Sequence, residues 1–187
     1  MPAPDSTNDP GLVLRLMRAD EAAAVGRLAR DAYARAYELP DAYLDDIEAV
    51  GDRARSQEVW VAADAVTGEL LGTVTTPRPA ERLSSVARHE DELDFRFLAV
   101  SPAARGRRVG EAMVRHVFGL AASRGIRRVV LNTGAQMVPA QRLYERLGFQ
   151  PLDDREFSFA REDGTLVRIL AYGIDVPAAP AAGGAAA

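Results

Sequence analysis

Cysteine and lysine are both absent from this chain of 187 residues. Without cysteine, the chain has no disulfide, no thiolate nucleophile and no cysteine-based metal site. Without lysine, its 23 strongly basic side chains are all arginine, and the phosphate-binding pattern G-x-x-x-x-G-K-[ST] is excluded. The dinucleotide pattern G-x-G-x-x-G is missing too. An anion would therefore have to be held by arginine side chains or by backbone amides.

An excess of positive charge and long apolar runs are also lacking. The formal net charge is −4, so the chain has no strongly basic surface for a nucleic-acid backbone. No apolar run approaches the ~20 residues of a membrane-spanning helix, and the first residues lack the basic and apolar stretches of a secretory signal. We therefore expect no nucleic-acid partner, no membrane association, no bound metal and a cytoplasmic location.

The two ends of the chain differ in composition from its middle. Residues 1–11 are rich in Pro, Asp, Ser, Thr and Asn, which predicts a flexible N-terminal arm. Residues 177–187 contain only Ala, Pro and Gly, which predicts a disordered tail. The remaining residues, 12–176, suit one domain, because domains cluster near ~100–150 residues and few exceed ~250.

Hydrophobic periodicity divides residues 12–176 into strands and helices. Strands are expected at residues 12–16, 58–62, 70–75, 94–100, 128–133, 157–160 and 167–172. Helices are expected after Asp20 (as the capping residue), from Pro40, after Gly110 and over 140–147, with Gly125 and Gly148 ending the helices that precede them. This alternation predicts an α/β class or an α+β sandwich with a mixed sheet.

The most informative segment joins the strand that ends at Val100 to the next helix. The connection Arg105-Gly106-Arg107-Arg108-Val109-Gly110 is basic and contains two glycines. The start of a helix leaves amide groups unpaired and carries partial positive charge, and glycine lets a bulky anion approach the backbone closely. The pattern therefore favours a phosphate or pyrophosphate site. The alternative is a solvated basic turn before a surface helix.

Two motifs carry a resemblance to a known family. Leu98-Ala99-Val100-Ser101-Pro102 followed by residues 105–110 resembles the acetyl-CoA motif R/Q-x-x-G-x-G/A of the GNAT acetyltransferase superfamily. Residues 140–149, AQRLYERLGF, are similar to its second hallmark, A-x-x-L-Y-x-x-x-G-F. Both motifs occur in the family's order, and the resemblance covers nearly all of residues 12–176. It implies a single GNAT-like domain with a central mixed, mostly antiparallel, twisted sheet flanked by helices.

The resemblance also implies a cofactor site. Acetyl-CoA would be the acetyl donor, with its pantetheine arm along the strand and its pyrophosphate on the turn. The cofactor-binding residues implied are Leu98, Ala99, Val100, Arg105, Gly106, Arg107, Arg108, Val109, Gly110 and Glu111. Arg108 stands where the motif usually has glycine, and its Cβ is expected to keep it in ordinary dihedrals. Met137 stands where many relatives carry asparagine, which removes one polar contact.

Tyr144 resembles the family's general acid. Amine attack on the thioester expels a coenzyme thiolate, and a phenol with a pKa of ~10 can protonate a thiolate whose conjugate acid lies nearer ~8.5. The other interpretation is a core tyrosine beside Leu143 and Leu147 on an amphipathic helix. A backbone amide near Leu98 to Val100 would stabilise the oxyanion.

The general base is less defined. Candidates are Asp94, Glu92 and His89, and Asp94 is preferred because strand alternation places it on one face with Arg96 and Leu98. The other interpretation is a solvated acidic loop over residues 89–92, with Asp94 at the surface pairing with Arg96. His116 is expected at the surface of the helix that follows the motif.

The function that the resemblance implies is an N-acetyltransferase acting directly on a primary amine of a small molecule or peptide. The alternatives are a non-catalytic acyl-CoA-binding or sensing domain and an acyltransferase for longer acyl chains. Tyr33, Tyr37, Tyr43 and the loop 78–85 occupy regions that often shape the acceptor pocket in this family, although each tyrosine also suits an ordinary packing role. Dimers are common in similar proteins, so a homodimer is one expectation.

Overall fold

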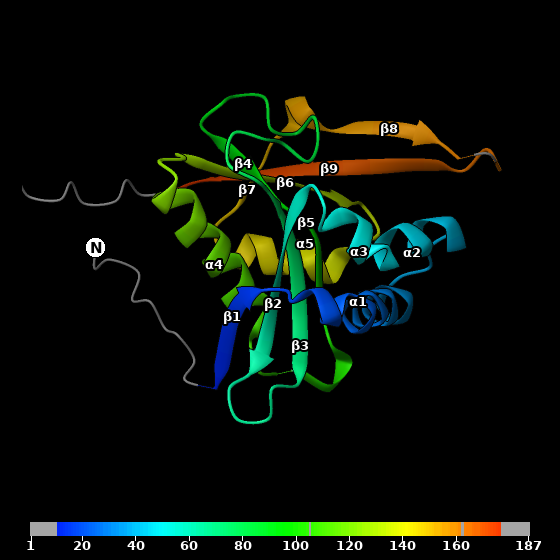
Figure 1. Cartoon of the computed structure of the whole chain (residues 1–187). Coiled ribbons are helices and arrows are strands. Elements are labelled where there is room, and N and C mark those ends of the chain that lie inside the picture. Colours follow the sequence, from blue (N-terminus) through cyan, green and yellow to red (C-terminus); the bar gives the residue numbers. More distant parts are fainter. Residues whose placement is uncertain (1–10, 105, 162, 177–187) are drawn as a thin grey trace, which may run out of the picture. The chain divides into compact units, whose positions relative to one another are not determined.

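The computed structural model describes residues 11–104, 106–161 and 163–176, so most of the expected arm and the whole expected tail lie outside the described part. Their contacts group the described residues into two compact units. The first comprises the residues up to Thr75 and Phe97–Arg115, and the second comprises Thr76–Arg96 and the residues from His116 onward. Figure 1 labels the elements of both units, which together show the predicted mixed α/β class.

The first unit is built on a four-stranded sheet with the order β1-β2-β3-β5. The strands are β1 (Leu12–Leu16), β2 (Gln57–Asp64), β3 (Leu70–Pro77) and β5 (Arg96–Val100). The first two pair antiparallel, with Leu14 opposite Ala62. Before the second strand come the helices α1 (Ala22–Ala36), α2 (Asp41–Glu48) and α3 (Val50–Arg53). Because β5 comes last in the strand order, it is an edge strand of its sheet.

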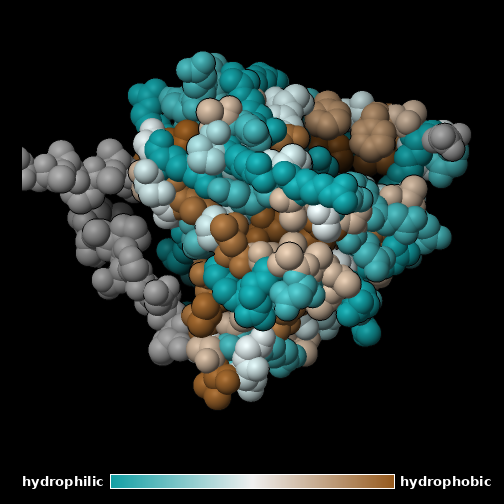
Figure 2. Space-filling model, viewed as in Figure 1, coloured by the Kyte–Doolittle hydropathy of each residue, from teal (hydrophilic) through white to brown (hydrophobic). Residues whose placement is uncertain are grey.

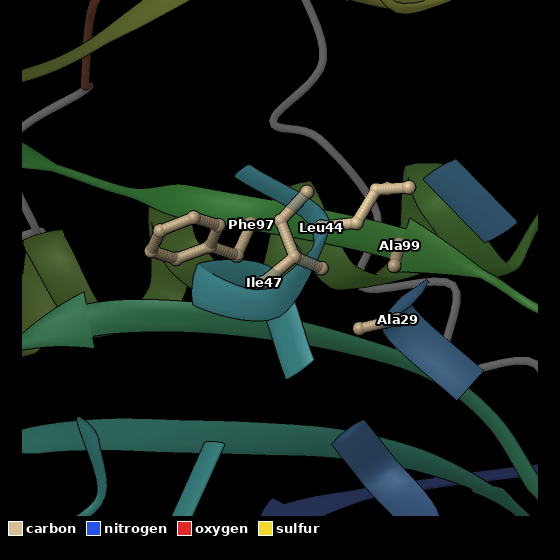
Figure 3. Close-up of a cluster of buried hydrophobic side chains, with 5 residues drawn as sticks. All are labelled: Ala29, Leu44, Ile47, Phe97 and Ala99. Atoms are coloured by element: carbon tan, nitrogen blue, oxygen red, sulfur yellow. The ribbon is translucent and has the colours of Figure 1, made fainter. Parts of the chain in front are cut away.

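A compact apolar cluster joins the helices of this unit to β5. Figure 3 shows Ala29 of α1, Leu44 and Ile47 of α2, and Phe97 and Ala99 of β5 directed toward one another. The guanidinium of Arg53 lies over the Phe97 ring, 4.2 Å from its centroid, a cation–π arrangement. The cluster fixes the strand that precedes the basic turn.

The start of α1 differs from the expectation that Asp20 caps it. Asp20 lies inside a short 3-10 helix, Ala19–Glu21, and the residue that organises the segment is Glu21. The Glu21 carboxylate accepts two hydrogen bonds of 2.7 Å from the Arg15 guanidinium and one of 2.8 Å from the Arg18 amide. The hydrogen bonds from Arg15 lower the pKa of Glu21 to about 2, against the opposing effect of burial.

This lowered pKa predicts an acid-sensitive contribution to stability. A carboxyl whose folded pKa lies below its ordinary 4.5 stabilises the fold above that value and loses this contribution as the pH falls toward 2. In denaturant titrations, Glu21→Gln should therefore be less stable than the wild type at pH 7, and the difference should shrink by pH 3. The exposed neighbour Asp20→Asn is the control. A difference that stays constant with pH would show that Glu21 acts through packing instead.

The second unit is built on a five-stranded sheet. Its main order is β4-β6-β9-β7, and β8 pairs with β9. The strands are β4 (Glu92–Asp94), β6 (Arg128–Gly134), β7 (Gln150–Pro151), β8 (Phe157–Ala160) and β9 (Leu166–Asp175). β4 pairs parallel with β6, and β6 pairs antiparallel with β9. The unit also holds α5 (Val138–Arg146) and a short 3-10 helix, Asp153–Arg155.

The expected single strand over residues 94–100 is instead two strands in different sheets. β4 ends at Asp94 and β5 begins at Arg96, and each pairs with a different neighbour. Phe97 has φ +55°, a left-handed conformation that is rare for a bulky residue. Burial still alternates along β5, where Phe97 and Ala99 are buried and the other three residues are half-buried. The expectation that Asp94 shares a face with Arg96 and Leu98 was wrong because Asp94 belongs to the other sheet.

Two aromatic side chains of β8 are exposed at the surface. Phe157 and Phe159 of β8 are both 46% exposed, and Figure 2 shows hydrophobic side chains gathered over this strand. Among the described residues β8 pairs only with β9, so it is an edge strand.

Over the same residues, no helix combines the length and apolar character needed to cross a membrane.

Candidate active site

The connection from β5 to the next helix is held to the sheet at its start. The Ser101 amide donates to the Leu71 carbonyl at 2.8 Å, which ties the end of β5 to β3. A 3-10 helix, Pro102–Ala104, follows, and the Ala104 amide donates to the Ser101 carbonyl at 2.9 Å. Helix α4 (Val109–Ser123) begins after a three-residue turn. The basic turn is therefore supported by the sheet on one side and begins a helix on the other.

Two residues of the turn are left-handed. Gly106 has φ +83° and Arg108 has φ +54°. The sequence-based expectation that the Cβ of Arg108 restricts it to ordinary dihedrals was wrong: Arg108 adopts the conformation that glycine favours at this motif position. A non-glycine residue held there costs roughly 1–2 kcal/mol, so the surrounding backbone must dictate the shape. The departure from the motif changes the side chain and leaves the path of the backbone glycine-like.

The turn and the first turn of α4 present donors suited to an anion. A helix that begins at Val109 leaves its first amides without intrahelical acceptors and carries partial positive charge at this end. Among the turn amides, that of Arg107 already donates to the Ala104 carbonyl at 3.2 Å. Glu111 is neutralised locally, since its carboxylate pairs with Arg115 at 2.8 Å. Arg105 lies outside the described residues.

Gly72 of β3 allows α4 to approach the sheet closely. A Cβ at position 72 would lie 2.9 Å from Val109 Cγ1, 3.0 Å from the Ala99 carbonyl oxygen and 3.0 Å from Met113 Sδ. Val109 and Met113 are both fully buried. The start of α4 is thus set by direct packing on β3, and this glycine carries no sequence signal that separates it from other strand glycines.

β5 offers backbone groups for a linear ligand. It is the edge strand of its sheet, so one side of its backbone has no strand partner among the described residues. Ala99 is buried, whereas Leu98 and Val100 are half-buried. These three residues are the ones that the motif associates with the pantetheine arm. Their free backbone edge is the feature that such an arm requires.

Tyr144 lies in the second unit, on α5. The helix ends in a Schellman motif: the Phe149 amide donates to the Tyr144 carbonyl and the Gly148 amide to the Glu145 carbonyl, both at 3.0 Å, with Gly148 at φ +93°. The Tyr144 side chain is only 6% exposed. Its ring contacts Phe149 edge-on at a centroid distance of 5.6 Å and Phe95 at 6.0 Å. The ring is therefore part of the core, and its orientation is fixed by aromatic packing.

Met137 occupies the N-cap position of α5 and is buried. Its amide donates to the Gly134 carbonyl at 2.9 Å, so the backbone is used in the turn between β6 and α5. The Gln141 side chain donates to the same carbonyl at 3.0 Å and to the Ala135 carbonyl at 2.9 Å. The side chain of Met137 is thus buried in the packing at the start of α5.

Asp94 is fully buried, which contradicts its interpretation as a surface residue paired with Arg96. One carboxylate oxygen accepts the Leu83 amide at 3.0 Å, and the other accepts the Ser84 hydroxyl at 2.8 Å. Burial raises the pKa of Asp94, and the hydrogen bonds from Leu83 and Ser84 only partly oppose it. Ser84 is half-buried, whereas the carboxylate that its hydroxyl contacts is fully buried.

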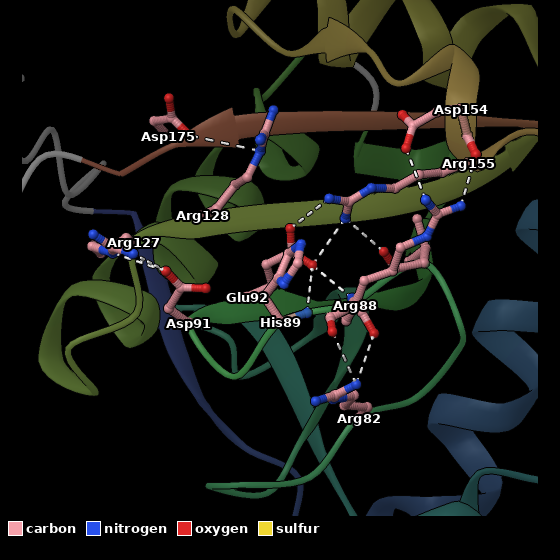
Figure 4. A network of polar contacts seen from close by, with 12 residues as sticks. Arg82, Arg88, His89, Asp91, Glu92, Arg127, Arg128, Asp154, Arg155 and Asp175 are labelled. Atoms are coloured by element: carbon pink, nitrogen blue, oxygen red, sulfur yellow. Dashed lines mark hydrogen bonds and ion pairs between the residues drawn. The ribbon is translucent and has the colours of Figure 1, made fainter.

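The Glu92 carboxylate is fully used in contacts within the second unit. Its carboxylate pairs with Arg155 at 2.8 Å, and these side chains are 2% and 7% exposed. It also accepts the amides of Arg88 at 2.6 Å and His89 at 3.1 Å (Figure 4). Burial acts to raise the pKa of Glu92, but the hydrogen bonds outweigh it and the pKa is lowered. The interpretation of residues 89–92 as a solvated loop was therefore wrong for Glu92, while His89 is exposed.

The sequence also offered His116 and three tyrosines of the first unit as candidates. His116 on α4 is half-buried rather than at the surface as expected. Tyr33 and Tyr37 of the first unit form an edge-on pair with a ring-centroid distance of 5.8 Å. Tyr33 and Tyr43 pack against the apolar cluster shown in Figure 3. These tyrosines thus have packing roles, and Tyr37 is half-buried.

Comparisons with known proteins agree with the two motifs. A sequence model of the Acetyltransferase (GNAT) family matches residues 22–149. The chain is 32% identical over 103 residues to mycothiol acetyltransferase of Cellulomonas flavigena, a match that covers 52% of this chain and 30% of that relative. The chain thus spans less than a third of the relative's length.

Solved structures share the fold. Arabidopsis thaliana NAA60, in complex with a bisubstrate analogue, gives a TM-score of 0.64 at 18% identity and covers 90% of this chain and 99% of its own. Salmonella typhimurium yncA, with its cofactor acetyl-CoA, gives a TM-score of 0.61 at 18% identity, covering 92% and 99%. Because the family match extends from the first helix to the end of the second motif, the chain belongs to the GNAT acetyltransferase family.

Proposed function

We propose that this chain is an acetyl-CoA-dependent N-acetyltransferase that moves an acetyl group directly to a primary amine of a small molecule or peptide. The observation that carries the proposal is the turn at residues 106–108. It has two left-handed residues and an arginine at the glycine position, and it opens directly into a helix of 15 residues. The mycothiol acetyltransferase relative supports acetyl transfer, and the yncA structure with acetyl-CoA supports this donor.

The first unit supplies the coenzyme contacts in this proposal. The amides at the start of α4, together with Gly106 and Arg108, hold the pyrophosphate, and the open edge of β5 at Leu98 to Val100 accepts the pantetheine arm. A β5 amide stabilises the oxyanion formed when the amine attacks the thioester carbonyl carbon. The described residues fit this donor, because they combine an anion-binding helix start with an unpaired strand edge.

The second unit supplies the proton transfers. As the carbon–sulfur bond breaks, Tyr144 donates its phenol proton to the coenzyme thiolate and later recovers a proton from solvent. Asp94 takes the proton that the amine loses. Since Asp94 is fully buried, the amine proton passes to Ser84 while the Ser84 hydroxyl proton passes to Asp94. The raised pKa of Asp94 makes its carboxylate a better base than an ordinary aspartate.

The acceptor class is a primary amine, and a cytoplasmic location suits a chain without cysteine. Two features favour a second candidate, a non-catalytic acyl-CoA-binding domain: Glu92 is bound in an ion pair, and Asp94 has no exposed surface.

Calorimetric titration separates these candidates. Purified protein is titrated with acetyl-CoA, with CoA and with adenosine diphosphate, and is then assayed with a panel of amines. The proposal expects saturable binding of acetyl-CoA and CoA, much weaker binding of adenosine diphosphate because it lacks the pantetheine arm, and turnover with at least one amine. Binding without turnover on any amine would favour the binding domain. No binding at millimolar acetyl-CoA would overturn both.

A further inference from the structure

An ion pair joins the basic turn to the end of β2. Arg107 Nη2 lies 2.7 Å from Asp64 Oδ2. The other carboxylate oxygen, Oδ1, accepts the amides of Val66 at 3.0 Å and Thr67 at 2.9 Å, which closes the turn between β2 and β3. The Thr67 amide and then the Arg107 guanidinium hold the pKa of Asp64 well below its usual range. Asp64 is thus negatively charged at ordinary pH values, and its carboxylate connects the β2–β3 turn to the basic turn.

A permanent negative charge beside an anion-binding turn has two opposite consequences. If Arg107 binds phosphate through its guanidinium, Asp64 competes for that guanidinium and repels the ligand, so Asp64 weakens binding. If Arg107 instead serves to anchor the turn, Asp64 strengthens binding by keeping the amides in place. The geometry favours anchoring. The Arg107 amide is tied to the Ala104 carbonyl, and its side chain is tied to Asp64.

The anchor also accounts for the shape of the turn. Arg107 stands between the two left-handed residues, Gly106 and Arg108. Without an external restraint, a non-glycine residue at position 108 would relax to an ordinary conformation and turn its amide away. A side-chain bond from Arg107 to a residue fixed at the end of β2 restrains both neighbours at once.

We infer that Asp64 is a positioning residue for coenzyme binding, which holds the turn at residues 106–108 in its anion-binding conformation through Arg107. Arg107 then contributes to binding as an anchor and not as a phosphate ligand. This inference rests on the proposed function, because it names a determinant of the same coenzyme site. It assigns a role to two residues 43 positions apart in the sequence.

The substitution Asp64→Asn isolates the ion pair. Asparagine keeps one oxygen as the acceptor for the Val66 and Thr67 amides and replaces Oδ2 with an NH2 donor, so both the charge and the hydrogen-bond acceptor that face Arg107 are lost. We expect the Kd and KM for acetyl-CoA to rise by about three- to fivefold, the range of a partly exposed ion pair, with kcat at saturating acetyl-CoA unchanged. Arg107→Ala should match it, and the double variant should be no weaker than the weaker single variant.

Two further variants keep the result interpretable. Arg107→Lys should largely restore affinity, since the structure shows a single bond from this side chain to Asp64 that an ammonium can replace. Arg108→Ala, in the same turn but outside the pair, should add its effect to that of Asp64→Asn. Calorimetry with acetyl-CoA measures each affinity, and thermal denaturation checks that every variant is folded.

The sign of the Asp64→Asn effect decides the question. Tighter binding, or unchanged binding with a loss in Arg107→Ala, would mean that Arg107 is a phosphate ligand and would overturn the inference. Failure of the wild type to bind acetyl-CoA would instead overturn the proposed function, so the two failures are distinguishable.

Discussion

Replacing Tyr144 with phenylalanine should lower kcat by about 100-fold or more while changing the Kd for acetyl-CoA by less than about twofold. The variant removes only the hydroxyl. The ring keeps its edge-on contacts with Phe95 and Phe149, so the aromatic cluster and the end of α5 should remain intact. A general acid acts on the transition state and not on ground-state binding, which is why the loss should fall on kcat. Steady-state kinetics and calorimetric titration measure the two effects separately.

Tyr172 provides a matched control. Its ring packs on Tyr144 at a centroid distance of 6.3 Å, and it is similarly buried. Its hydroxyl, 3.4 Å from Glu145, has no role in the proposed chemistry, so Tyr172→Phe should leave kcat close to the wild-type value. Equal losses in both variants, or a parallel loss of acetyl-CoA affinity in Tyr144→Phe, would mean that Tyr144 serves the core and not the reaction.

Gly26→Ala should be among the most destabilising single-methyl additions in the chain. A Cβ at this position of α1 would lie 2.5 Å from the carbonyl oxygen of Glu48, at the end of α2. The opposing atom belongs to the backbone, so no side-chain rotation relieves the clash and the two helices must separate. Overpacking of this kind costs about 1–3 kcal/mol, which exceeds the gain of about 1 kcal/mol from alanine's better helix propensity. Denaturant titration measures the difference.

Gly119→Ala is the matching control, because Gly119 is also inside a helix. A Cβ there would meet no other atom within 4 Å, so only the better helix propensity of alanine should affect the free energy of unfolding. We expect this variant to be more stable than the wild type by about 0.5–1 kcal/mol. Wild-type stability of Gly26→Ala would show that α1 and α2 do not hold their described spacing, and destabilisation of Gly119→Ala would show that the surroundings of Gly119 are not open.

The sequence predicted well those features that depend on residues near one another in the chain. The strand over residues 12–16, the start of α2 after Pro40 and the left-handed stop at Gly148 follow from local periodicity and from the intrinsic conformational freedom of glycine. The two family motifs were likewise continuous segments. The family match confirms them, because it contains the whole of the first motif with its helix and ends at the last residue of the second motif.

The features that sequence analysis missed depend on contacts between distant residues. Residues 94–100 do not indicate by themselves that the chain changes sheets there, because the break between β4 and β5 depends on pairing with strands that are distant in the sequence. The same holds for Arg108, whose left-handed backbone is imposed from outside the motif. Glu92 looked like part of an exposed acidic run, but its partner Arg155 lies 63 residues away. Asp64 and Ser84 belong to no motif at all.

The division of residues between the two compact units limits how the chain can be cut. The backbone passes from one unit to the other after Thr75, after Arg96 and after Arg115, so each unit is assembled from separated stretches of sequence. A fragment that ends at Thr75 keeps β1, β2 and Asp64 but loses β5, Arg107 and the start of α4. No single truncation or proteolytic nick can therefore release either unit with its own residues complete, because separating the two units would need three breaks.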